Sequence, residues 1–116
     1  MPVEVPVVVV RWEQFVLWLL DRTEKFPKRM AFTFRTRIDS LALDVYERLV
    51  EARYQRDREA LLRRVNLDLE KLRLLLRLSH AQRALDHRAY EHAAEELQTV
   101  GRMIGGWQSQ QRSSSE

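Results

Sequence analysis

Cysteine is absent from the 116-residue chain, and glycine and proline are scarce, with three of each. Without cysteine, the chain can form no disulfide, thiolate metal site or cysteine nucleophile, which fits a reducing cytoplasm. Three glycines and three prolines are too few turn-forming residues for a turn-rich sandwich or barrel. The remaining composition, 45% hydrophobic and 32% charged, is that of one folded domain and not of a disordered chain.

Long apolar runs are also missing. The longest, at residues 7–10, is far shorter than the ~20 residues that a membrane span needs. Residues 1–4 lack the basic region with which a secretory signal begins. We therefore expect a cytoplasmic protein that has no membrane partner.

The sequence lacks the motifs of common catalytic and metal sites. It has neither a glycine-rich phosphate loop nor a nucleophile elbow. His87 and His92 are five residues apart, which does not place them on one helical face as an HExxH zinc site requires. The Glu-x-x-His motif of di-metal bundles is also missing. We expect no catalytic residue, no metal and no cofactor, and hence a binding or assembly role.

Hydrophobic periodicity predicts helices over residues 11–25, about 27–55, 57–84 and 86–107. Pro27 ends the first helix, Asp57 and Asp86 are N-cap candidates, and Gly105 with Gly106 resembles a C-terminal stop. Residues 1–10 contain two prolines and stiff β-branched valines, so we expect them to be extended. The polar tail at 108–116 is expected to be disordered. The predicted fold is all-α, an antiparallel up-down-up-down four-helix bundle over residues 11–107.

The third predicted helix has two apolar faces. One stripe suits the bundle core and contains Leu62, Val65, Leu69, Leu72 and Leu76. A second stripe lies roughly opposite and contains Leu67, Leu74, Leu78, Ala81 and Leu85. An exposed apolar face usually marks an interface, so this stripe predicts a homo-oligomer. Alternatively, the N-terminal valine segment or a skewed neighbouring helix covers it within the same chain.

Basic residues form two groups, although the net charge of +3 is modest. The first group lies between residues 25 and 37, in a stretch without Asp or Glu, and contains Lys25, Lys28, Arg29, Arg35 and Arg37. Because a helix N-terminus favours anions, this positive charge points to an external anion such as a phosphate backbone. A merely solvated face is the alternative. Phe26, Phe32 and Phe34 are interleaved with the cations and either stack on bases or belong to the core.

The second basic group is Arg73 and Arg77, which are four residues apart within the apolar run LRLLLRL. Residues at this spacing project together from a helix. The two guanidinium groups either bind phosphate or an acidic partner surface, or they pair with Glu70 and with Asp residues of another subunit.

Three segments carry a resemblance to a known family: VGRMIGGW at residues 100–107, FPKR at 26–29 and LRLLLR at 72–77. With them the chain resembles the accessory variability determinant (Avd) proteins of diversity-generating retroelements. This family lies within a wider four-helix-bundle group that includes proteins encoded by intervening sequences of 23S ribosomal RNA genes.

The resemblance implies a homopentameric ring without catalytic activity of its own. It also implies a positively charged surface that binds the retroelement reverse transcriptase and its template RNA or cDNA. Arg73 and Arg77 match the family's L-R-x-x-x-R segment, and Lys28 and Arg29 match its Pro-basic-basic turn. Two alternatives stay open: a ribosomal-RNA-associated bundle without a reverse transcriptase partner, and a structural oligomer whose arginines form ion pairs between subunits.

Overall fold

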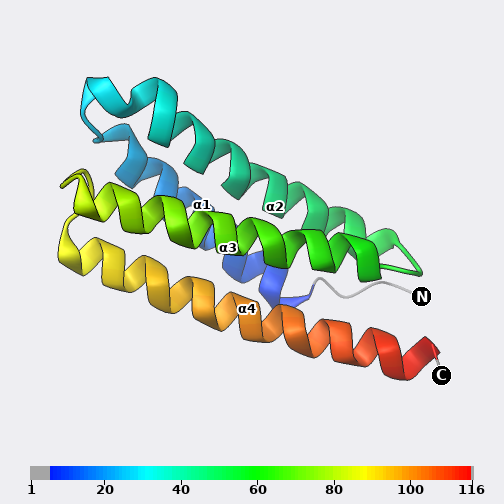
Figure 1. Cartoon of the computed structure of the whole chain (residues 1–116). Coiled ribbons are helices and arrows are strands. Elements are labelled where there is room, and N and C mark those ends of the chain that lie inside the picture. Colours follow the sequence, from blue (N-terminus) through cyan, green and yellow to red (C-terminus); the bar gives the residue numbers. More distant parts are fainter. Residues whose placement is uncertain (1–5, 116) are drawn as a thin grey trace.

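The computed structural model describes residues 6–115, with side chains as far as residue 112. Within this range the chain forms four α-helices and no β-strand (Figure 1). They are α1 (Val7–Glu24), α2 (Thr36–Tyr54), α3 (Glu59–Ala81) and α4 (His87–Ser115). A short 3-10 turn (Lys28–Met30) and one π-helical turn (Ala31–Arg35) connect α1 to α2. Each helix runs antiparallel to the one before it, as predicted for a four-helix bundle.

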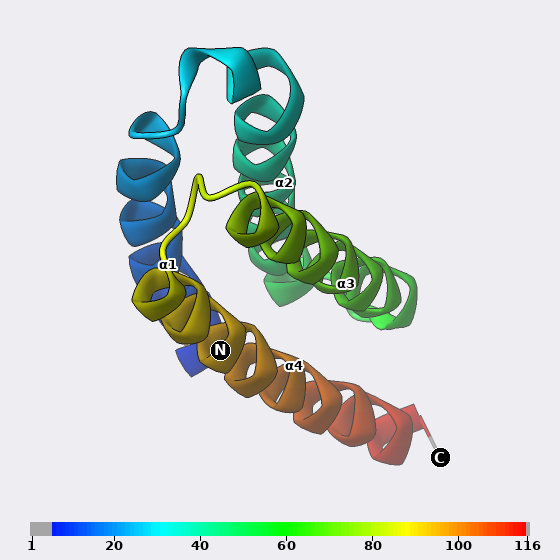
Figure 2. The ribbon, with the colours of Figure 1, turned by 60° about the vertical axis from the view of Figure 1, so that its left-hand side comes forward.

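The four helices surround a common apolar core, and Figure 2 shows them from an oblique angle. Each helix packs against its two neighbours, so α1 lies diagonally opposite α3. The core contains one apolar stripe from each helix, including the fully buried Trp12, Leu49, Leu72 and Leu97. The Trp12 indole N–H donates a hydrogen bond of 2.9 Å to the carbonyl oxygen of Ala42, which satisfies its only polar group.

Helix α1 begins earlier than the sequence predicted. Pro6 is its N-cap and residues 7–10 are helical, so the expectation of an extended segment is wrong there. Val8 and Val9 are buried in the core, and this burial outweighs the weak helix propensity of valine. The other residues of the predicted extended segment, 1–5, lie outside the described residues.

Helix α4 continues through Gly105 and Gly106, which the sequence analysis took as its end. Neither glycine has a positive φ, so neither adopts the left-handed conformation of a helix stop. The predicted disordered tail is therefore wrong for residues 108–115. Contacts with α3 hold this extension, because Asn66 donates a 2.9 Å hydrogen bond to the side-chain oxygen of Gln108.

A buried ion pair joins α2 to α3. The Asp68 carboxylate is fully buried, and Arg48 of α2 donates a hydrogen bond to its Oδ2. Arg64, one turn earlier on α3, places its Nε 3.6 Å from Oδ1. A charge this deep is tolerated only when it is paired, so these arginines make Asp68 compatible with the core.

Candidate nucleic-acid and self-association surfaces

The predicted basic segment lies at the end of the bundle where α1 connects to α2. This connection lies beside the turn between α3 and α4 in the structure (Figure 1). The Arg29 guanidinium donates two hydrogen bonds across the two connections, to Oε1 of Gln82 at 3.3 Å and to its carbonyl oxygen at 3.4 Å. Lys28 and Arg29 are both exposed. The basic connection between α1 and α2 therefore contacts the turn between α3 and α4.

Carboxylates one helical turn away neutralise part of this segment. Lys25 pairs with Asp21 at 3.4 Å, and the Nε of Arg35 lies 3.8 Å from Asp39. The stretch itself contains no Asp or Glu, but in the folded chain Asp21 and Asp39 neutralise two of its five cations. Of the five predicted cations, Lys28, Arg29 and Arg37 have no carboxylate partner among the described residues.

Arg83 adds a cation to this end that the sequence analysis missed. Helix α3 ends in a Schellman motif, in which the N–H groups of Arg83 and Ala84 donate to the carbonyl oxygens of His80 and Ser79 at 3.0 and 2.9 Å. Arg83 takes the left-handed position of this motif with φ 62°. Glycine usually fills such a position, because a side chain there costs about 1 kcal/mol. Arg83 is exposed and follows Gln82, the residue that Arg29 contacts.

The three phenylalanines have different environments. Phe26 is buried in the core and Phe34 packs against it. Phe32, on the π-helical turn, is 92% exposed. Only Phe32 of the three is therefore free to stack on a base.

Arg73 and Arg77 do not act as a matched pair. Arg73 forms a 2.6 Å ion pair with Glu70 of the same helix. The alternative in which Glu70 neutralises an arginine therefore holds for Arg73, within one copy of the chain. Arg77 is exposed and has no carboxylate partner among the residues described. Arg77 lies one turn before the end of α3, toward the end of the bundle that carries Arg83.

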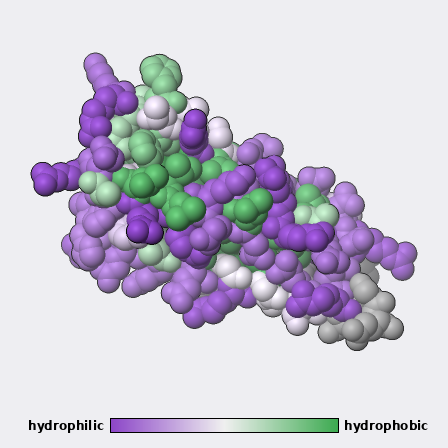
Figure 3. Space-filling model, viewed as in Figure 1, coloured by the Kyte–Doolittle hydropathy of each residue, from purple (hydrophilic) through white to green (hydrophobic). Residues whose placement is uncertain are grey.

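The second apolar stripe of α3 faces solvent along most of its length. Leu67, Leu74 and Leu78 are 48%, 49% and 51% exposed, and Ala81 is also exposed. Leu85 was wrongly assigned to this stripe: α3 ends at Ala81, and the turn that follows directs Leu85 into the core at 3% exposure. Apolar side chains gather on the α2–α3 side of the molecule (Figure 3). Residues 7–10 belong to α1 and do not cover this stripe.

A groove of about 510 Å³ runs between α2 and α3 beside this stripe. It brings Arg37 of the basic segment next to Leu74 of the apolar stripe, with Leu41 and Leu75 as further apolar lining. Lys71 also lines the groove and has no carboxylate partner in the described part of the chain. The groove thus has an apolar lining and two unpaired cations, together with one carboxylate, Asp44, which lies 4.0 Å from Arg48.

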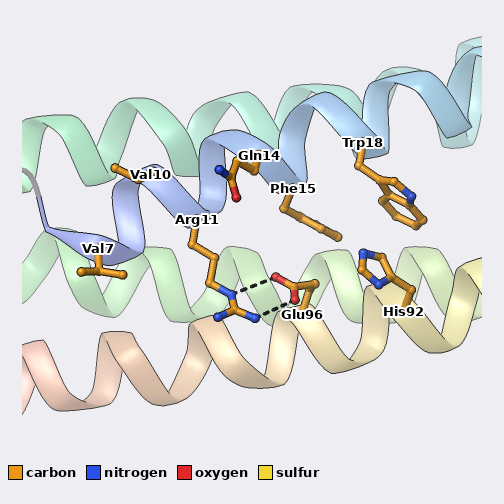
Figure 4. A pocket seen from close by; sticks show the side chains of 8 residues that line it. All are labelled: Val7, Val10, Arg11, Gln14, Phe15, Trp18, His92 and Glu96. Carbon is orange, nitrogen blue, oxygen red and sulfur yellow. Dashed lines mark hydrogen bonds and ion pairs between the residues drawn. The ribbon is translucent and has the colours of Figure 1, made fainter.

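A second groove, of about 500 Å³, lies between α1 and α4 (Figure 4). The Arg11 guanidinium crosses it and donates to both carboxylate oxygens of Glu96, at 3.1 and 2.8 Å. These hydrogen bonds hold the pKa of Glu96 below its ordinary value and raise that of Arg11. The His92 and Trp18 rings form a T-shaped contact with 4.7 Å between their centres. The charged residues Arg11 and Glu96 of this groove are paired with each other, whereas Arg37 and Lys71 of the groove between α2 and α3 have no carboxylate partner in the described part of the chain.

Residues 6–115 contain no group of three or more His, Asp or Glu side chains placed to hold a metal ion. No helix among them is long and apolar enough to cross a membrane.

The comparison with protein families agrees with this architecture. The bAvd-like family matches residues 6–111, which cover α1, α2, α3 and α4 as far as residue 111. The chain therefore belongs to the bAvd-like family, and the resemblance found in the sequence is confirmed. No curated protein and no solved structure matches the chain significantly.

Proposed function

We propose that this chain is a non-enzymatic accessory protein of a diversity-generating retroelement. It binds the retroelement reverse transcriptase and its template RNA or cDNA through a basic surface, and in this way supports mutagenic retrohoming. The observation that carries the proposal is the family match over residues 6–111. The charge at one end of the bundle gives the proposal a physical mechanism.

The nucleic-acid surface consists of Lys28, Arg29 and Arg83. They come from two connections that lie side by side, and none of them has a carboxylate partner among the described residues. Exposed cations that are not neutralised by the protein can exchange their counterions for phosphates, and the released ions favour binding. Phe32, also in the α1–α2 connection, offers an exposed ring on which a base can stack.

Self-association through the α3 stripe is part of the proposal, with a homopentameric ring as the assembly. Burial of Leu67, Leu74 and Leu78 against another copy removes apolar surface that one copy leaves in water. In a cyclic assembly, the same end of every copy lies at the same height along the axis. The basic ends then form one continuous positive rim, to which RNA binds at several points at once.

The reverse transcriptase surface centres on Arg77. Arg77 is the unpaired member of the pair Arg73 and Arg77, whereas Arg73 is engaged by Glu70. An exposed guanidinium beside an apolar stripe suits an acidic protein surface with apolar contacts.

A co-purification experiment tests the proposed function. The cognate reverse transcriptase is tagged and coexpressed with this chain and the template RNA, and the amount of chain retained is measured. We expect Arg73→Ala combined with Arg77→Ala to reduce retention by the reverse transcriptase while helicity, measured by circular dichroism, stays unchanged. Arg102→Ala combined with Arg112→Ala removes the same charge from exposed positions of α4 and is the matched control.

Equal retention of both double variants would contradict the assignment of Arg77. If the unmodified chain is not retained by the reverse transcriptase but binds ribosomal RNA, the function is that of the intervening-sequence group. If it binds no nucleic acid at low salt and its oligomer dissociates at high salt, the arginines serve as ion pairs between subunits.

A further inference from the structure

A small pocket lies between the last turns of α1 and the first turn of α4. It has a volume of about 230 Å³, and its lining consists of Trp18, Arg22, Asp86, Arg88, Ala89 and His92. Trp18 and His92 also line the larger groove between α1 and α4, so the pocket continues that groove (Figure 4). The cation of the larger groove, Arg11, is neutralised by Glu96. The small pocket differs, because it contains two arginines, one from each helix.

The first arginine, Arg22 of α1, is held by an aromatic ring and not by a carboxylate. Its guanidinium carbon lies 5.4 Å from the centre of the Trp18 ring, which is a cation–π distance. Its Nε is shielded from solvent and has no hydrogen-bond partner, and the side chain forms no ion pair with any described residue. The stack on Trp18 therefore holds the guanidinium beside the pocket, while its terminal N–H groups remain available to a ligand.

The second arginine, Arg88, lines the pocket from the first turn of α4. It is exposed and has no carboxylate partner within residues 6–115. Asp86 is the one carboxylate of the lining, and its Oδ1 accepts a 2.8 Å hydrogen bond from the N–H of Ala89. Asp86 therefore serves as the N-cap of α4 and does not neutralise an arginine. With His92 neutral, the lining carries one excess positive charge and two guanidinium groups without an acceptor.

We infer that this pocket binds a phosphate monoester through Arg22 and Arg88. Each planar guanidinium presents paired N–H donors that match the spacing of phosphate oxygens. A terminal phosphoryl group has three acceptor oxygens and a charge of about −1.5 to −2 at pH 7, so it can accept from both arginines at once. A carboxylate, with two oxygens and one charge, satisfies only one of them. Because a water molecule takes up about 30 Å³, the pocket has room for a phosphoryl group and several waters.

The phosphate pocket is separate from the proposed nucleic-acid surface. Lys28, Arg29 and Arg83 form that surface, and none of them lines the pocket. The inference therefore depends neither on RNA binding by these cations nor on a reverse transcriptase partner. A phosphate monoester occurs both in a free nucleotide and at the 5′ end of a nucleic-acid strand. The two sources present the same chemistry to Arg22 and Arg88, and they differ in what is attached to the phosphoryl group.

Isothermal titration calorimetry of the full chain with inorganic phosphate, at constant ionic strength, tests the site. We expect Arg22→Met and Arg88→Ala each to weaken binding roughly tenfold, because each removes charge-assisted hydrogen bonds to the phosphate. Methionine keeps an apolar stem against Trp18, and Arg88 is exposed, so the fold tolerates both changes. Asp86→Asn should strengthen binding, because asparagine caps a helix about as well as aspartate but carries no negative charge. Circular dichroism checks that every variant stays helical.

Two controls separate the pocket from the overall charge of the protein. Arg102→Ala removes an exposed charge from α4 outside the pocket and should leave phosphate affinity unchanged. The triple alanine variant of Lys28, Arg29 and Arg83 should also keep its phosphate affinity, even where it loses RNA binding. If the unmodified chain binds no phosphate, or if Arg102→Ala weakens binding as much as Arg88→Ala, the inference is wrong while the proposed RNA surface is unaffected.

Two further ligands identify the source of the phosphoryl group. A nucleoside 5′-monophosphate that binds more tightly than its nucleoside, in the unmodified chain but not in Arg88→Ala, indicates a free nucleotide. A 5′-phosphorylated oligonucleotide that binds more tightly than its 5′-hydroxyl form, with the same dependence on Arg88, indicates a strand end. If the phosphoryl group strengthens binding of neither ligand, the pocket is not a phosphate monoester site.

Discussion

Replacing Gly105 and Gly106 with alanine should stabilise the protein, because both residues lie inside α4. Neither has a positive φ, and a Cβ added at either position would meet no atom within 4 Å. Alanine therefore gains helix propensity without a steric cost. In a helix interior, glycine is less favourable than alanine by about 1 kcal/mol per residue.

The full gain for the two substitutions is about 2 kcal/mol if α4 unfolds together with the bundle. Neighbouring residues support this coupling: Ile104 is fully buried, and the Trp107 ring lies under the Arg58 guanidinium at 5.1 Å. For a domain of this size, each kcal/mol raises the melting temperature by roughly 4 °C. We therefore expect an increase of roughly 8 °C for the double variant.

Thermal unfolding followed by far-ultraviolet circular dichroism measures this gain. The melts are recorded at several protein concentrations, because self-association makes the melting temperature depend on concentration. Gly101→Ala is the control, since it is stabilising whether α4 ends at Gly105 or continues to Ser115. If the two glycines instead formed a left-handed helix stop, alanine would be strained at that position. A fall in melting temperature for the double variant, with a rise for the control, would therefore refute the continuous helix.

Three other changes have expected outcomes. Arg48→Met should cost about 3–5 kcal/mol in urea unfolding, because the fully buried Asp68 carboxylate loses the partner that donates a hydrogen bond to it; a loss below about 1 kcal/mol would show that Asp68 is not a buried charge. Pairing with Arg11 lowers the pKa of Glu96 in the folded protein. The pair therefore stabilises the protein at pH values above the ordinary glutamate pKa of about 4.3. This stabilisation is lost as the pH falls through the lowered pKa of Glu96 in the folded state. The stability of the parent and of Glu96→Gln should thus differ at pH 7 and converge at low pH, and a difference that persists would contradict the pairing. Arg83→Gly should relieve up to about 1 kcal/mol of backbone strain yet weaken RNA binding, and unchanged RNA affinity would remove Arg83 from the basic surface.

Most of the helical core was predictable because a period of 3.6 residues is a strong signal. The buried stripe of α3, from Leu62 to Leu76, is fully inside as expected. The start of α1 was not predictable from local preference. Valine at residues 7–10 favours strands, and only the packing of Val8 and Val9 into the core makes the segment helical.

The candidate surfaces were predictable only where their residues are close in sequence. The cations Lys28 and Arg29 form a visible run, but Arg83 joins them through the contact between Arg29 and Gln82, which no local pattern reveals. Leu85 was misplaced because helical periodicity was extended beyond the turn at Arg83.

The central claim is that a localised basic end binds nucleic acid, and its most direct test is the salt dependence of RNA affinity. Binding of the template RNA is measured by fluorescence anisotropy over a range of salt concentrations. The parent is compared with the triple alanine variant of Lys28, Arg29 and Arg83, and with the control triple Arg56→Ala, Arg63→Ala and Arg102→Ala. Each lost phosphate contact lowers the slope of log K against log salt by about one. We predict a shallower slope and weaker binding for the first triple alone, whereas equal effects of both triples would show that net charge, and not this surface, binds the RNA.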